Sequence, residues 1–213
     1  MQKNGVLKVF AVWMSVMTLW SAYRYFFRAT PIWIEEILLK PIPYIGLVLW
    51  FFHDKGTMIS DVLGFRTANI KKIIIWGGGF GTCIVGEAVF VWIFNGRTFM
   101  LPSSTTSWIL GLSIPLATAI SEEILYRGFL MEQFWQKLGN SWIANAISTL
   151  LFVVGHLAHG IFIFRYTGFE FFMYLWLMAL LGYINGLIYE KTRSIYPTIF
   201  FHALWNFSNA VIT

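Results

Sequence analysis

Long apolar stretches separated by short polar breaks run through this chain. A helix needs about 20 apolar residues to cross the hydrocarbon core of a bilayer, and several stretches approach that length. They run from Leu7 to Tyr23, Pro43 to His53, Ile73 to Phe94, Ser107 to Phe134, Trp142 to Phe164, Phe169 to Tyr189 and Ile195 to Ile212. The pattern predicts an all-α fold, a polytopic membrane helical bundle of about seven transmembrane helices.

The second stretch is the shortest of the set. It reaches a spanning length only if its helix begins as far back as Ile32 and accommodates Glu35, Glu36 and Lys40. Because successive spans alternate in direction, the loss of this one would invert every span after it.

Basic residues set the expected orientation, because lysine and arginine collect in cytoplasmic loops. With a cytoplasmic N-terminus, five of the 15 Lys and Arg residues fall outside and the other ten fall inside. The five outside are Arg24, Arg28, Lys40, Arg97 and Arg165. We therefore expect a multi-pass protein of the cell membrane with its N-terminus in the cytoplasm.

Composition supports the same class and excludes several others. Of the 213 residues, 58% are hydrophobic and 12% are charged, which is more apolar surface than a water-soluble domain of this size can bury. The net charge of +5 requires no nucleic-acid partner, because basic residues beside membrane spans attract anionic lipids. The single cysteine, Cys83, excludes an intrachain disulfide and a cysteine-based metal site.

Polar and ionisable residues gather in three of the later apolar stretches. The clusters run from Ser121 to Arg127, from Phe152 to His156 and from His202 to Asn206. A charged group at mid-bilayer costs roughly 2.5–3.5 kcal/mol on insertion scales, so these groups face the protein interior or a wet cavity. We therefore divide the chain into N-terminal transmembrane helices, residues 1–106, and a helical core, residues 107–213, with an active site expected in the last four helices.

The first cluster contains two adjacent glutamates with different expected roles. Residues four apart on a helix share a face, so Glu123 and Arg127 can pair. Glu122 is rotated by about 100° from Glu123 and points elsewhere. The spacing predicts that Arg127 anchors Glu123 as a supporting residue and that Glu122 stays free to act as a general base.

The other two clusters supply imidazoles and an amide. His202 and Asn206 are four residues apart, which lets both donate hydrogen bonds into one cavity. Two such donors resemble an oxyanion hole, which stabilises the tetrahedral intermediate of amide hydrolysis. His156 would hold the water that Glu122 deprotonates or would protonate the leaving amine. Together these residues predict a hydrolase without a serine or cysteine nucleophile.

The chain resembles the CPBP family of intramembrane proteases, also called Abi or CAAX-protease-like, in three motifs that follow one another along the sequence. The motifs are Glu122-Glu123-x-x-x-Arg127, Phe152-x-x-x-His156 and His202-x-x-x-Asn206, within residues 107–212. The resemblance implies a glutamate-type peptidase that needs no cofactor. In such an enzyme Glu122 and His156 would activate water, while His202 and Asn206 would stabilise the oxyanion.

Two alternatives stay open. Glu122, His156 and His202 match the three-ligand pattern of catalytic zinc, so a zinc-dependent intramembrane protease would use the same residues. The same buried groups would equally brace a non-catalytic immunity or scaffold protein of the membrane. For an enzyme, the expected partner is a membrane-associated peptide or protein substrate within the lipid bilayer.

Overall fold

A computed structural model describes residues 3–53, 60, 63–65, 70–84, 86 and 102–211 of the chain. Every regular element within these residues is a helix, which confirms the all-α fold. The predicted span from Ile73 to Phe94 is described only in its first part, and the rest of it lies outside the described residues.

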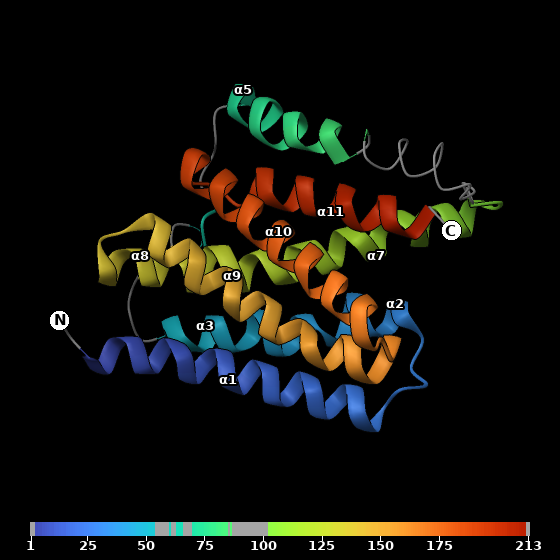
Figure 1. Ribbon diagram of the computed structural model, residues 1–213, viewed down its shortest axis with the longest axis horizontal. Coiled ribbons are helices and arrows are strands. Elements are labelled where there is room, and N and C mark those ends of the chain that lie inside the picture. Colours follow the sequence, from blue (N-terminus) through green and yellow to red (C-terminus); the bar gives the residue numbers. More distant parts are fainter. Residues whose placement is uncertain are drawn as a thin grey trace.

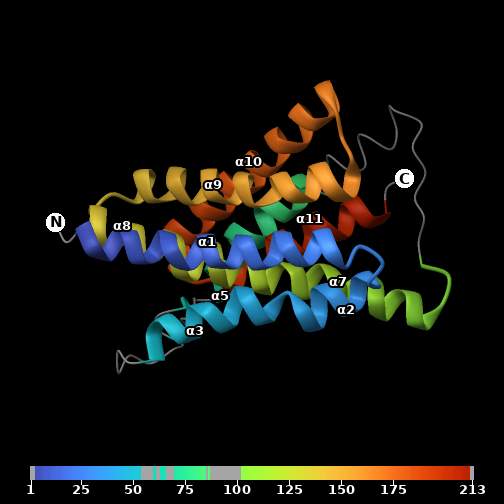
Figure 2. The ribbon, with the colours of Figure 1, turned by 90° about the horizontal axis from the view of Figure 1, so that it is seen from below.

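The N-terminal half begins with two antiparallel helical runs (Figure 2). The first is α1 (Lys3–Phe26), and the second comprises α2 (Ile32–Ile34), η1 (Glu35–Leu39), η2 (Ile42–Gly46) and α3 (Leu47–Phe52). Pro31 precedes the second run, and its fixed backbone suits a helix start. The run therefore begins at Ile32, as a full second span requires, and it keeps Glu35, Glu36 and Lys40 within the helix.

A third run and the C-terminal half complete the bundle. α5 (Ile70–Lys72) and η4 (Ile73–Gly78) lead into helix as far as residue 84. α7 (Thr105–Glu123), η5 (Ile124–Met131) and α8 (Glu132–Leu138) form one helix of 34 residues. α9 (Ser141–Ala158) with η6 (His159–Phe164), then α10 (Gly168–Thr192), and finally α11 (Tyr196–Val211) follow in order.

A sharp turn reverses the chain between α8 and α9. Gly139 ends α8 with a φ of 69°, a left-handed conformation that glycine adopts at little cost. The side chain of Asn140 then accepts a hydrogen bond from the Ile143 N–H and so begins α9.

Four helices are long and apolar enough to cross a membrane: Gly5–Phe26, Thr105–Leu138, Ser141–Phe164 and Gly168–Thr192. α11 is shorter, with 16 residues, and the run that begins at Ile32 carries buried charged side chains. The four long helices make this a multi-pass membrane protein, as the hydropathy pattern predicts.

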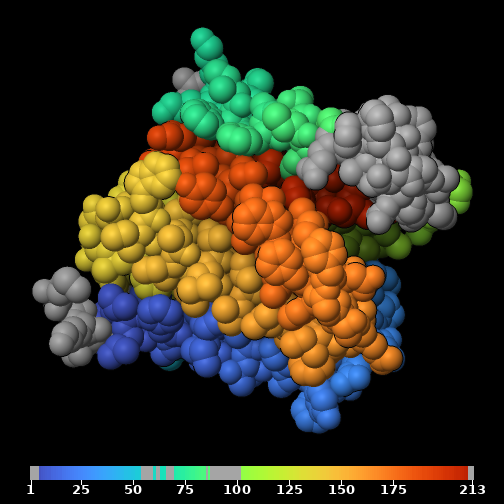
Figure 3. All heavy atoms as spheres, viewed as in Figure 1, coloured from blue at the N-terminus to red at the C-terminus, as the bar shows by residue number. Residues whose placement is uncertain are grey.

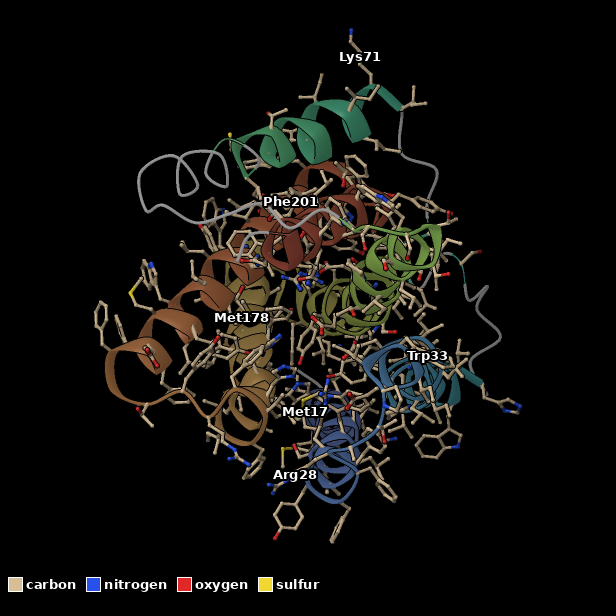
Figure 4. The ribbon with its side chains drawn as sticks, turned by 90° about the vertical axis from the view of Figure 1, so that its right-hand side faces the viewer. Met17, Arg28, Trp33, Lys71, Met178 and Phe201 are labelled. Carbon is tan, nitrogen blue, oxygen red and sulfur yellow. The ribbon has the colours of Figure 1, made fainter. Side chains whose placement is uncertain are left out.

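Consecutive helical runs alternate in direction, so α1 begins at one end of the bundle and α11 ends at the other (Figure 1). Figure 4 looks along the helices, with Trp33 and Lys71 pointing outward. α7 packs against both η1 and α11. Residues 121–134 of the long central helix are all buried, so the first polar cluster lies in the core.

Two glycines bring α10 close to α9, the helix that carries His156. A Cβ at Gly186 would overlap the side chain of Asn145, and one at Gly182 would lie 3.1 Å from Thr149. The Asn145 amide donates to the backbone carbonyl of Tyr183 across this contact. Small residues allow such close packing of helices in lipid.

Substitution of Gly186 by alanine tests this contact. We expect Gly186→Ala to lower the free energy of unfolding by about 1–3 kcal/mol, because the added methyl group overpacks the helix interface. The matched control is Gly46→Ala, since a Cβ there would meet no atom of the described residues within 4 Å apart from its own helical segment. That change should be neutral or should stabilise the helix by up to about 1 kcal/mol. Unfolding in one detergent compares them, and equal stability of both variants would contradict the packing account.

Candidate functional site

Glu122 lies in the last turn of α7 and is only 5% exposed. Lys40 donates a hydrogen bond of 2.6 Å from its Nζ to Oε1 of Glu122. The other oxygen, Oε2, lies 3.6 Å from Nε2 of His202 and 3.9 Å from Nε2 of His156. One carboxylate oxygen is therefore held by a cation, while the other faces an imidazole from α9 and one from α11.

Both imidazoles are fixed by a hydrogen bond at Nδ1. That atom of His202 lies 2.8 Å from Oε1 of Glu123, and that of His156 lies 2.8 Å from the carbonyl oxygen of Phe152. A carbonyl and a carboxylate only accept hydrogen bonds, so each Nδ1 carries the proton. In the neutral rings, both Nε2 atoms then turn a lone pair toward Glu122.

Arg127 and Glu123 form the predicted pair, with Nη1 of Arg127 3.2 Å from Oε1 of Glu123. Arg127 also donates to the Gly182 carbonyl of α10, and the same Glu123 oxygen contacts His202 of α11. Both side chains are at most 1% exposed. Glu123 therefore does more than balance Arg127, because it also orients the imidazole that faces Glu122.

The prediction that Glu122 has no charged partner is wrong, whereas its role as a general base stays a prediction. The first prediction considered only partners within the same helix, whereas Lys40 reaches Glu122 from a segment 82 residues earlier in the chain. Lys40 is 4% exposed and also donates to Oε2 of Glu36, at 2.8 Å. Arg24 and the Thr118 hydroxyl each donate to Glu36 as well, both at 2.8 Å.

Sequence reasoning missed Lys40, Glu36 and Arg24 as parts of the site. A usable signal was present, because buried charges within an apolar segment point to function wherever they occur. Glu36 and Lys40 are also four residues apart, the spacing of a helical ion pair. Hydropathy alone places both charges within the second span and does not connect them with Glu122.

The buried ions nearly balance one another. The cluster joins three basic groups with four carboxylates: Arg24, Lys40, Arg127, Glu35, Glu36, Glu122 and Glu123. With both imidazoles neutral, the formal charge is 3 − 4 = −1. Burial of ions is tolerable only when each one has a partner of opposite sign. One negative charge of the cluster is therefore not offset by the basic groups that belong to it.

The ring of Phe152 packs among the site residues and is fully buried. Its centroid lies 4.3 Å from the ring of His156 and 6.0 Å from that of His202. The guanidinium of Arg127 lies over the same ring at 5.2 Å, within range of a cation–π interaction. Phe152 thus contacts both imidazoles through its ring and holds His156 through its carbonyl as well.

Asn206 stands apart from this group. It lies one turn beyond His202 on α11, partly buried, and its side chain makes no hydrogen bond to any described residue. The structure therefore brings together Glu122, His156 and His202, supported by Glu123 and Arg127, and leaves the amide of Asn206 without a partner in the described part of the chain.

The three converging side chains are the ones that a zinc-dependent enzyme would use. Two zinc ligands at tetrahedral angles lie about 3.4 Å apart, and Oε2 of Glu122 lies 3.6 Å from His202 and 3.9 Å from His156. The Lys40 ammonium already compensates the charge of Glu122. Within the described residues, no group of three His, Cys, Asp or Glu side chains is arranged to hold a metal ion.

Glu122 and His202 are buried within the bundle, whereas the side chain of His156 is 18% exposed. Figure 3 shows α1, α9 and α10 packed together on one face of the bundle. A separate apolar cavity of about 130 Å³ lies beside α11, and none of the site's ionisable residues lines it. Its walls are Phe80, Cys83, Ile84, Leu177, Leu180, Ile184, Phe201 and Trp205.

Comparison with known families gives an independent result. The model of the family described as "Type II CAAX prenyl endopeptidase Rce1-like" matches residues 103–208. This range includes all three motifs and excludes Lys40, Glu36 and Arg24. None of the curated protein sequences matches the chain. On the strength of its C-terminal half, the chain belongs to the CPBP family of CAAX-type membrane proteases.

Proposed function

We propose that this protein is an intramembrane endopeptidase in which Glu122 is the general base that activates water. Membership of the family makes it a CAAX-type membrane endopeptidase in general terms. The mechanism and the roles of individual residues are the proposal. The count of basic residues supports a cytoplasmic N-terminus in the cell membrane.

One observation carries the proposal: three hydrogen-bond acceptors converge at one point. They are Oε2 of Glu122, at 3.6 Å from His202 and 3.9 Å from His156, and the Nε2 lone pairs of those two imidazoles. A water between them donates one O–H to Oε2 of Glu122 and the other to one of the two imidazoles, and separations of this size suit such a bridge. Such a water has its O–H bonds polarised by a carboxylate, which favours its attack on a carbonyl carbon.

The proposed hydrolysis is described by the paths of the two protons of the attacking water. The water oxygen bonds to the carbonyl carbon of the peptide as one water proton passes to Glu122. The resulting tetrahedral intermediate collapses, the C–N bond breaks, and the proton passes to the leaving amine from Glu122 or through His156. The other water proton leaves with the new carboxyl group. The overall formal charge of −1 lets the cluster hold the transferred proton without becoming positive.

Asn206 and His202 are the proposed donors to the oxyanion. The Asn206 amide has unpartnered N–H groups among the described residues and lies on the same helix face as His202. In the neutral ring Nε2 of His202 accepts a hydrogen bond, because the Nδ1 proton is committed to Glu123 at 2.8 Å. His202 therefore donates to the oxyanion only after the water proton taken up by Glu122 passes to its Nε2 and makes the ring an imidazolium. The carboxylate of Glu123 would stabilise that cation.

The proposed substrate is a membrane-associated peptide or protein. The reactive group lies among helices long and apolar enough to span a membrane, which suits a substrate that is itself bound to the bilayer. The family description adds prenylated substrates as one option to test.

Replacement of Glu122 by glutamine tests the base directly. We expect Glu122→Gln to lower kcat at least 100-fold, because general-base catalysis contributes about 10²–10⁴-fold. Cleavage of membrane-anchored peptides, prenylated and unprenylated, by purified protein in lipid measures this. The variant should stay folded, since the amide still accepts a hydrogen bond from Lys40.

The matched control is Glu170→Gln, which changes an exposed glutamate on α10 and should leave kcat unaltered. A chelator added to the wild type distinguishes the zinc-dependent mechanism from the metal-independent one. Activity that a chelator removes and added zinc restores would contradict the metal-independent mechanism. A wild type that cleaves no peptide would favour a scaffold protein instead.

Asn206→Ala tests the oxyanion donor. We expect kcat to fall about 10²–10³-fold with little change in KM, as for loss of one preorganised donor. Asn209→Ala is the control, because Asn209 lies one turn further along α11 and donates to the carbonyl of Trp205. Steady-state kinetics of both variants decide the point, and equal kcat values for the two would remove Asn206 from the mechanism.

A further inference from the structure

We infer that Lys40 is a positioning residue for Glu122, one whose ammonium holds one carboxylate oxygen so that the other faces the two imidazoles. The inference rests on the proposed function. It gives the N-terminal half of the chain a part in the site, although the family match begins only at residue 103.

The geometry of the Glu122 carboxylate carries the inference. Its two oxygens have different surroundings, because Oε1 receives the Lys40 ammonium at 2.6 Å while Oε2 has no hydrogen-bond partner in the described residues. A charge-assisted hydrogen bond of this length is among the stronger ones in proteins. It restricts rotation of the carboxylate and keeps Oε2 toward His156 and His202.

Lys40 is itself held firmly, unlike most lysines. Its ammonium donates to Glu36 at 2.8 Å and lies 5.6 Å from the ring centroid of Trp20 and 5.4 Å from that of Tyr44. The side chain is 4% exposed, so the long stem has little freedom to move. A preorganised cation positions its partner with less loss of entropy than a mobile one.

A chain of contacts connects this lysine to the rest of the bundle. Glu36 accepts from Arg24 of α1 and from Thr118 of α7, each at 2.8 Å. The order Arg24, Glu36, Lys40, Glu122 therefore runs without a break from α1 through η1 to the end of α7. α1 and the run that begins at Ile32 thus complete the site, in addition to anchoring the protein in the membrane.

The alternative role for Lys40 is charge balance alone. Charge balance and positioning of Glu122 predict different kcat values for the same variants. If Lys40 only neutralises buried carboxylates, removal of one carboxylate together with the ammonium should restore the enzyme. If Lys40 positions Glu122, the same pair of changes should restore folding and leave turnover low. Lys40→Met and the double variant Lys40→Met with Glu36→Gln separate the two roles.

The experiment measures kcat, KM and thermal unfolding in lipid for these variants, for Lys40→Arg and for a surface control, Lys191→Met. We expect Lys40→Met to lower kcat about 10- to 100-fold with KM within about twofold, as for loss of residues that orient catalytic groups. The double variant should unfold near the wild-type temperature and keep the low kcat. Lys40→Arg should recover part of the loss, and Lys191→Met should match the wild type.

Three results would overturn the inference. The first is wild-type kcat in Lys40→Met, and the second is recovery of kcat in the double variant, which would reduce Lys40 to charge balance. If Lys40→Met fails to fold, the kcat of the double variant alone decides between charge balance and positioning. The third is either a wild type that cleaves no peptide or a Glu122→Gln variant with wild-type kcat. Either result overturns the proposed function and the inference with it. Loss of activity in Glu122→Gln beside full activity in Lys40→Met would leave the function standing and remove only the inference.

Discussion

The contact between Lys40 and Glu122 is the interaction on which the site depends. A carboxylate buried between membrane helices is costly unless a cation and hydrogen-bond donors surround it. Glu122 gains its cation at 2.6 Å from a segment distant in sequence, and this lysine is held in turn by Glu36. The packing of α1, the run that begins at Ile32 and α7 brings these charges together.

The same constraint shapes the chemistry. Because Lys40 occupies one oxygen of Glu122, only the other is available to act on water. Glu123 and the carbonyl of Phe152 fix the imidazoles so that both Nε2 atoms turn toward that oxygen. Buried ion pairs that hold the fold thus also orient the groups proposed to act in hydrolysis, and Arg127 ties the set to α10.

The sequence predicted the helices and the side-chain pair within one helix, and it missed side-chain contacts between helices. Hydropathy predicted the helical bundle, and four-residue spacing predicted the pair of Glu123 and Arg127. The partner of Glu122 was not predictable from spacing, since Lys40 lies 82 residues away and meets it only through packing between segments. The commitment of His202 to Glu123 was missed for the same reason, because it joins α11 to α7.

In the proposed mechanism, water attacks the peptide carbonyl directly. The chemical form of the cleavage product shows whether it does. The most direct measurement is cleavage of a membrane-anchored peptide by the wild type in water labelled with heavy oxygen, with hydroxylamine present. Direct attack by water predicts a single labelled oxygen in the new carboxyl group and no hydroxamate. Hydroxamate in the product would reveal an acyl-enzyme and would contradict the role of Glu122 as the base that activates water.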